Sequence, residues 1–82
     1  MKEQQDLISL FRQVASQVDK RDFPQVTGES VISDLGIDSL SMMQIVGEME
    51  LRLNITIPDE DLVELVTVAD LVKVVQNRIE QI

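Results

Sequence analysis

Residues 35–40 read Leu-Gly-Ile-Asp-Ser-Leu, and at this stretch an irregular segment changes into one whose apolar residues recur at helical spacing. Asp38 is of a residue type that favours the N-cap position of a helix. Ser39 is therefore predicted to open a helix, with its hydroxyl exposed in the first turn. The helix is predicted to end near residues 53–54, because Asn54 suits the left-handed conformation that often follows a helix.

The neighbours of Asp38 and Ser39 are expected to shape this helix start. Gly36 allows the chain to turn close to it, because glycine adopts backbone conformations that other residues avoid. Ile37 and Leu40 are apolar and are expected to anchor the turn to the core, which leaves the Ser39 hydroxyl pointing outward.

Three further helical segments are predicted, one before this helix and two after it. The first, at about residues 2–18, has apolar residues at helical spacing with polar residues between them. A long connection follows to about residue 37, in which Pro24 and Gly28 disfavour helix. Connections longer than about 12–15 residues are usually functional or disordered, and the apolar residues spread along this one predict a loop pinned to the core.

The chain after the central helix is predicted to form an extended connector at residues 55–57 and then two helices. The first of these is short, at residues 58–65, and begins with a proline followed by three acids. The second, at residues 68–82, starts beside Thr67 and Asp70, which resemble a capping box with Asp in place of Glu.

These elements predict an all-α fold, namely a small four-helix bundle of three long helices and one short helix, with a long loop between the first and second. The 82 residues fit a single domain, residues 1–82, with a core of limited size. The predicted core residues are Leu7, Phe11, Val14, Val46, Leu62, Leu71 and Val75.

Composition favours some kinds of partner over others. A formal net charge of −8 disfavours nucleic acid and anionic membrane surfaces, and it favours basic protein surfaces. No apolar run approaches the roughly 20 residues that cross a bilayer. The chain has no cysteine for a disulfide or a thiolate metal site. We therefore expect a cytoplasmic monomer that is neither exported nor inserted into a membrane.

The residue types present predict neither catalysis nor metal binding. The chain has no His to act as the base for a serine nucleophile and no Cys thiol, so a hydrolase based on Ser39 is rejected. An acidic cluster after Pro58 lacks the glycine and the ligand spacing of a calcium loop. Its members are interpreted as helix-start residues near the positive end of the dipole, and they are Asp59, Glu60, Asp61 and Glu64.

At residues 35–40 the sequence resembles the acyl carrier protein family, and the predicted helix count and long first loop extend the resemblance over nearly the whole chain. The resemblance implies that Ser39 carries a 4′-phosphopantetheine arm, taken from coenzyme A, which holds acyl groups as thioesters. It implies that phosphopantetheinyl transferase recognises Asp38. The implied role is a non-enzymatic carrier that serves separate biosynthetic enzymes of the acyltransferase and ketosynthase type.

One polar strip on the central helix departs from the family pattern. At about 100° per residue, Ser41, Gln44, Glu48 and Arg52 share a face. Family members of primary fatty acid synthesis usually carry acids along this strip, so the neutral Ser41 and Gln44 favour a polyketide or a mixed peptide and polyketide pathway. The residues expected to contact the transferase and partner enzymes are Asp38, Leu40, Ser41, Met43, Gln44, Gly47, Glu48 and Leu51.

The apolar residues of the central helix divide between the core and this surface. The best core candidates are Ile45, Val46, Met49 and Leu53, whereas Leu40, Met43 and Leu51 flank the polar strip and are candidates for exposure.

Other functions compete with this interpretation. They are a carrier of housekeeping fatty acid synthesis, a peptidyl or aminoacyl carrier, and an unmodified helical interaction module in which Asp38 and Ser39 only cap a helix. The peptidyl carrier is disfavoured, because such domains more often approach the serine with two glycines than with Gly-Ile. A bundle lined by aliphatic residues could open to admit an apolar acyl chain, but the sequence favours neither an enclosed nor an exposed chain.

Overall fold

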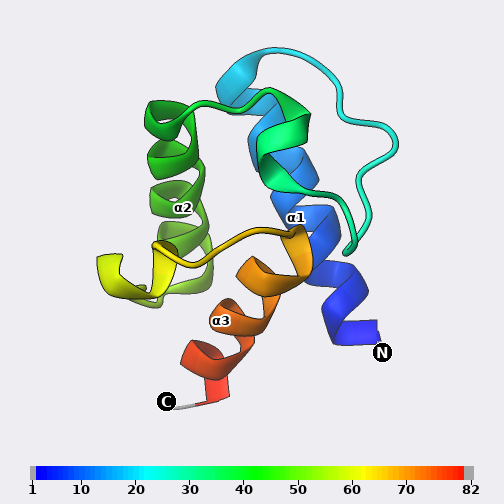
Figure 1. Cartoon of the computed structure of the whole chain (residues 1–82). Helices are drawn as coiled ribbons and strands as arrows, with labels where there is room; N and C mark the ends of the chain where they lie inside the picture. Colours follow the sequence, from blue (N-terminus) through cyan, green and yellow to red (C-terminus); the bar gives the residue numbers. More distant parts are fainter. Residues whose placement is uncertain (1, 81–82) are drawn as a thin grey trace.

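The computed structural model describes residues 2–80. Its α-helices are α1 (Lys2–Asp19), α2 (Ser39–Leu53) and α3 (Val68–Glu80), and two 3-10 helices, η1 (Ile32–Leu35) and η2 (Asp59–Leu62), lie in the connections. α1 packs against both α2 and α3 (Figure 1). The described residues contain no strand beyond an isolated antiparallel bridge, so the predicted all-α class is confirmed. None of the helices in this range combines the length and the apolar character needed to cross a bilayer.

α1 ends within one residue of its prediction. Its apolar residues form one face, on which Phe11, Val14 and Ala15 are fully buried. The helix stops at Asp19, and Lys20 adopts the left-handed conformation with a φ of 57°. The chain then enters the long connection to α2, which Figure 1 colours from cyan to green.

The long connection is pinned to the rest of the molecule, as its apolar residues predict. Val26 and Ile32 are buried. The Ile32 amide donates a hydrogen bond to the Val66 carbonyl at 2.8 Å, and the Val68 amide donates one to the Ser30 carbonyl at 2.9 Å. These bonds hold the connection beside the start of α3. The pattern does not predict η1, because a single turn has too few residues to show a periodicity.

The short helix predicted at residues 58–65 is not confirmed, and neither is the count of four helices. The segment forms only the 3-10 helix η2, in which the Asp61 amide donates to the Pro58 carbonyl at 3.0 Å. The proline and the acids do start a helical turn. Residues 66–67, however, pair with residues 30–32, so too few residues remain for a second turn.

The connector at residues 55–57 lies outside any helix, as predicted, and Glu50 holds it. Glu50 Oε2 accepts a hydrogen bond from the Ile57 amide at 2.6 Å, and the Glu50 carbonyl accepts one from the Ile55 amide at 3.1 Å. Asn54 has a φ of 57°, which confirms the predicted left-handed residue after α2.

α3 begins with the capping arrangement predicted for Thr67 and Asp70. Thr67 Oγ1 accepts a hydrogen bond from the Asp70 amide at 3.2 Å. Asp70 Oδ2 accepts hydrogen bonds from the Thr67 amide at 3.0 Å and the Val66 amide at 3.1 Å. The helix is described to Glu80, and the last two residues of the prediction lie outside the described residues.

The core lies between the three α-helices and the connections that cover them. Six of the seven predicted core residues are buried, whereas the seventh, Leu62, is half-buried. Leu62 belongs to η2, which sits at the edge of the core and borders the hollow described below.

Candidate functional site

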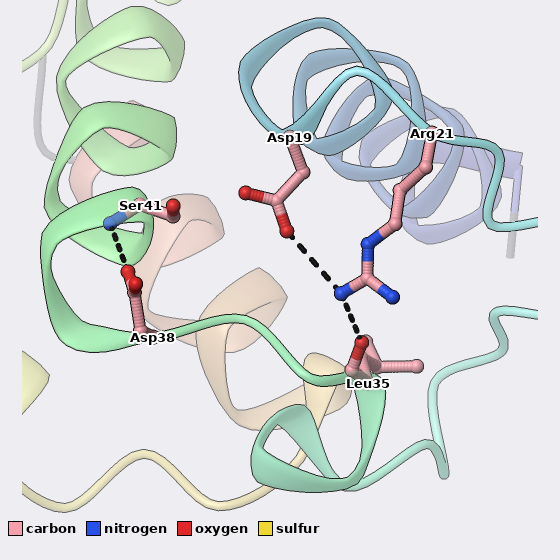
Figure 2. Close-up of polar contacts among 5 residues, drawn as sticks. All are labelled: Asp19, Arg21, Leu35, Asp38 and Ser41. Atoms are coloured by element: carbon pink, nitrogen blue, oxygen red, sulfur yellow. Dashed lines mark hydrogen bonds and ion pairs between the residues drawn. The ribbon is translucent and has the colours of Figure 1, made fainter.

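Ser39 is the first residue of α2, and its side chain is exposed. Asp38 precedes it as the N-cap, and Asp38 Oδ1 accepts a hydrogen bond from the Ser41 amide at 2.8 Å (Figure 2). The Ser39 hydroxyl makes no hydrogen bond to another residue in the described part of the chain. Asp38 therefore caps the helix, and the Ser39 hydroxyl is available to a partner molecule.

The Asp38 carboxyl is held in its charged form. The hydrogen bond from the Ser41 amide, assisted by the Ser41 hydroxyl, lowers the pKa of Asp38 below its ordinary value. Its negative charge lies at the start of α2, where the helix dipole favours an anion. At neutral pH a carboxylate therefore directly precedes the exposed hydroxyl.

The turn before Asp38 uses the glycine as predicted. Gly36 has a φ of 76°, in the left-handed region that favours glycine, and its amide donates to the Ser33 carbonyl at 3.3 Å. Ile37 is buried and anchors the turn to the core. Leu40 does not act as the second anchor that the sequence predicts, because its side chain is 68% exposed. The first turn of α2 points that side chain away from the core.

A hollow of about 420 Å³ lies beside Ser39. Residues of η1, α2 and η2 form its walls, together with the segment that precedes α3, and most of these residues are apolar. Its lining consists of Ile32, Ser33, Ile37, Asp38, Ser39, Met42, Met43, Val46, Leu62, Leu65 and Val66. An apolar group attached near Ser39 would find an apolar surface within reach.

The surface of α2 exposes the apolar residues that the sequence places there. Met43 is 64% exposed and Leu51 is 78% exposed, and a side chain added at Gly47 would meet open space. The core candidates Ile45, Val46 and Met49 are buried, and Leu53 is half-buried. Of the predicted contact residues, only Asp38 and Met43 line the hollow together with Ser39, and the others lie along α2 outside its lining.

The polar strip of α2 is partly occupied by contacts within the protein. Arg52 Nε lies 3.4 Å from Glu48 Oε1, and Arg52 Nη2 donates to Gln17 Oε1 of α1 at 2.6 Å. Glu48 thus has a positive neighbour, while Gln44 is exposed and Ser41 is half-buried. The strip presents little net negative charge to a partner.

Five lining residues of the hollow are not among the predicted core or site residues. Met42 lies on α2. Ile32, Ser33, Leu65 and Val66 lie in the two connections, which pair only in the folded chain. The apolar character of Ile32 predicts contact with the core, but no local pattern indicates that it borders a hollow.

Comparisons with known proteins agree with this geometry. Residues 9–75 match the protein family described as "Phosphopantetheine attachment site". The chain is 39% identical over 79 residues to the meromycolate extension acyl carrier protein of Mycolicibacterium aurum, covering 95% of this chain and 81% of that protein. It is 38% identical over 80 residues to the acyl carrier protein of an Exiguobacterium species, covering 96% of this chain and 100% of that protein.

The fold agrees with a solved structure as well. The crystal structure of an acyl carrier protein from Thermotoga maritima superposes with a TM-score of 0.90 and 29% identity, covering 96% of this chain and 93% of that one. The protein is thus a phosphopantetheine-binding carrier. It belongs to the acyl carrier protein family, which carries acyl groups on a covalently attached 4′-phosphopantetheine.

Proposed function

We propose that Ser39 is the attachment point of the 4′-phosphopantetheine arm. The observation that carries this proposal is the exposed hydroxyl of the first residue of α2, which bonds to no other described residue, follows the Asp38 carboxylate in the chain and borders the apolar hollow. The partial positive charge at the start of α2 favours the phosphodiester that would form there. The residues present therefore fit the group.

Attachment forms one bond and breaks one. The Ser39 oxygen bonds to the phosphorus of coenzyme A that bears the pantetheine, and the bond from that phosphorus to the adenosine bisphosphate breaks. The hydroxyl proton must pass to a base, and the chain contains no His, the usual base for a serine. We place this base on the transferase. Once attached, the arm supplies a thiol that holds acyl groups as thioesters.

The attachment site is tested by intact mass spectrometry. The wild type, Ser39→Ala and Ser41→Ala are each incubated with coenzyme A, with and without a broad-specificity phosphopantetheinyl transferase. We expect one added arm on the wild type and on Ser41→Ala, and none on Ser39→Ala. An arm on Ser39→Ala would disprove the assignment, and no arm on the wild type would favour the unmodified interaction module.

We place the partner surface on α2. Asp38 faces the transferase, and the exposed residues along the helix meet acyltransferase and ketosynthase-type enzymes. This surface combines exposed apolar side chains with a nearly neutral strip. We assign no catalysis to the chain itself. It acts in this proposal as a cytoplasmic monomer that binds neither nucleic acid nor membrane, and its surface residues are Leu40, Ser41, Met43, Gln44, Gly47, Glu48 and Leu51.

The neutral strip favours a polyketide or related secondary pathway. Docking there would depend on apolar contact more than on charge, since exposed charges mainly set encounter rate and salt dependence. We expect Met43→Ala to slow acyl transfer about threefold, which is the order of a modest interface contact. Glu48→Gln should change the rate less than this. Partner turnover against carrier concentration at two ionic strengths measures both, and a Glu48→Gln loss that vanishes at high salt, with none for Met43→Ala, would contradict the idea.

A fatty acid pathway is the second candidate, favoured by the apolar hollow and by the relative named for meromycolate extension. The two candidates differ in where the acyl group lies. Methyl NMR shifts of Val46 and Leu62 can be compared between protein bearing a saturated acyl chain and protein bearing a polar β-keto chain. Large shifts with the saturated chain alone would support the fatty acid pathway, and shifts with neither would support an exposed intermediate.

A further inference from the structure

Arg21 joins the end of α1 to the turn that precedes Ser39. Its Nη2 donates a hydrogen bond to the Leu35 carbonyl at 2.7 Å and lies 3.3 Å from Asp19 Oδ2 (Figure 2). The guanidinium also lies over the Phe23 ring, 4.7 Å from its centroid. One side chain thus contacts the end of α1, the start of the long connection and the end of η1.

The partners of Arg21 are themselves held in place. Asp19 closes α1, and Phe23 is buried in the core. The left-handed Lys20 turns the chain between them. The Arg21 side chain is nevertheless 48% exposed, so it adds little to the buried core. Three contacts fix the position of the Arg21 side chain, although its contribution to the free energy of unfolding is small.

Gly36 has no side chain that would disturb the contact between Arg21 and the Leu35 carbonyl. A Cβ at this position would lie 2.9 Å from Arg21 Nη2, so a larger residue would push the guanidinium aside and would also strain the positive φ. Gly36 directly follows the carbonyl that Arg21 binds, and it is two residues from Asp38. The contact therefore acts on the backbone that leads into the attachment site.

The other restraints on this backbone act at different points. Ile37 is buried, and the Asp38 cap bonds only within the first turn of α2. Among the described residues, Arg21 is the one side chain from α1 or the chain just after it that hydrogen bonds to residues 35–41. Without it, the turn at residues 35–36 would keep one hydrogen bond, from the Gly36 amide within η1, and the packing of the half-buried Leu35 against the core.

We propose that Arg21 is a positioning residue for the modification of Ser39, because it holds the 35–36 turn in the conformation that the transferase recognises. The proposal rests on the proposed attachment at Ser39. If a partner binds only molecules in which the turn is ordered, its apparent affinity falls in proportion as the fraction of such molecules falls. Loss of Arg21 should therefore raise the KM for the carrier and leave kcat nearly unchanged.

The test compares Arg21→Met with Arg12→Met in the full chain. Both variants remove one positive charge, and Arg12 lies on the exposed side of α1 without a side-chain hydrogen bond in the described range. Initial rates of arm attachment are measured by mass spectrometry against carrier concentration. We expect Arg21→Met to raise the KM about fivefold, as the loss of one hydrogen bond would, and Arg12→Met to leave it unchanged. Arg21→Lys, which keeps the charge and a donor, should give an intermediate KM.

Amide hydrogen exchange of the free protein separates positioning from direct contact with the transferase. We expect faster exchange at Gly36 and Ser41 in Arg21→Met than in the wild type or Arg12→Met. A raised KM with unchanged exchange, an equal rise in Arg12→Met, or no rise at all would each overturn the proposal. A wild type that takes up no arm at Ser39 would instead refute the proposed attachment site, so the two failures are distinguishable.

Discussion

The starts of α2 and α3 both use an aspartate that binds backbone amides, but they are built in opposite ways. At α3, Thr67 and Asp70 bond to each other's backbone, and the first helical residue, Val68, is fully buried. At α2, Asp38 caps alone, and the first helical residue, Ser39, is exposed. The same capping chemistry therefore occurs at a buried and at an exposed helix start. We call the buried start of α3 the closed start and the exposed start of α2 the open start.

The two starts also differ in how they are tied to the rest of the chain. The amides of Val68 and Ala69 donate to the carbonyls of Ser30 and Gly28 at 2.9 and 2.8 Å. At α2 the corresponding hydrogen bond within residues 2–80 comes from the Arg21 side chain to the Leu35 carbonyl, four residues before the helix. A helix start that supports the fold can be buried, whereas one that presents a group to enzymes must stay accessible.

The largest effect is expected at the closed start. Val68→Ala removes two methyl groups from a fully buried position and should lower the free energy of unfolding by about 2 kcal/mol. Leu40→Ala, in the first turn of α2, is the matched control and should change it by less than about 0.5 kcal/mol, because the side chain is exposed. Urea unfolding followed by circular dichroism measures both free energies. Equal losses in the two variants would contradict the difference in burial between the two helix starts.

A smaller effect is expected from the cap itself. Thr67→Ala deletes the hydroxyl that accepts the Asp70 amide and should cost about 1 kcal/mol in the free energy of unfolding. Thr56→Ala, at an exposed residue of the connector after α2, controls for the loss of a threonine hydroxyl. If urea unfolding shows the same loss of stability in both variants, the capping box does not stabilise the start of α3.

Local chemistry made much of the fold predictable from the sequence. Asp38, Asn54 and the pair of Thr67 and Asp70 mark helix ends through contacts within a few residues, and the structure shows all of them. Helix length was harder to predict after Pro58. The helix-start signal there is real, but the pairing of residues 66–67 with a distant segment limits it to one turn.

The site was predictable only where it depends on neighbours in the chain. The exposure of Ser39 follows from its polar side chain beside the anchoring Ile37, whereas the apolar Val68 is buried at the equivalent position after its cap. The hollow requires two connections to meet, and the Arg21 contact joins a side chain to a backbone carbonyl 14 residues away. Every residue has a backbone carbonyl, so the sequence does not indicate that the Leu35 carbonyl binds Arg21.

Acid should weaken the two starts unequally. Hydrogen bonds from the Thr67 and Val66 amides lower the pKa of Asp70, and a bond from the Ser41 amide lowers that of Asp38. Because both pKa values are lower in the folded state, the stability that each carboxylate adds is present above the unfolded pKa of about 3.9 and is lost as the pH falls through the folded pKa.

Two variants compare these contributions. We expect Asp70→Asn to reduce the acid dependence of unfolding more than Asp38→Asn does, because Asp70 accepts bonds from two backbone amides. Thermal unfolding from pH 7 to pH 2 measures the dependence. A larger reduction in Asp38→Asn would show that the open start relies more heavily on its carboxylate than the closed one.

The smallest effect on stability is expected at Ser39, the proposed attachment site. Ser39→Ala leaves the cap intact, because the capping oxygen belongs to Asp38, and it removes a hydroxyl that bonds to no described residue. The free energy of unfolding should change by less than about 0.5 kcal/mol, whereas a capping serine would cost about 0.5–2 kcal/mol. Urea unfolding of Ser39→Ala beside Thr67→Ala is the direct comparison. A loss of 1 kcal/mol or more would mean that the Ser39 hydroxyl supports the helix, and the two starts would then differ only in burial and in their hydrogen bonds to distant parts of the chain.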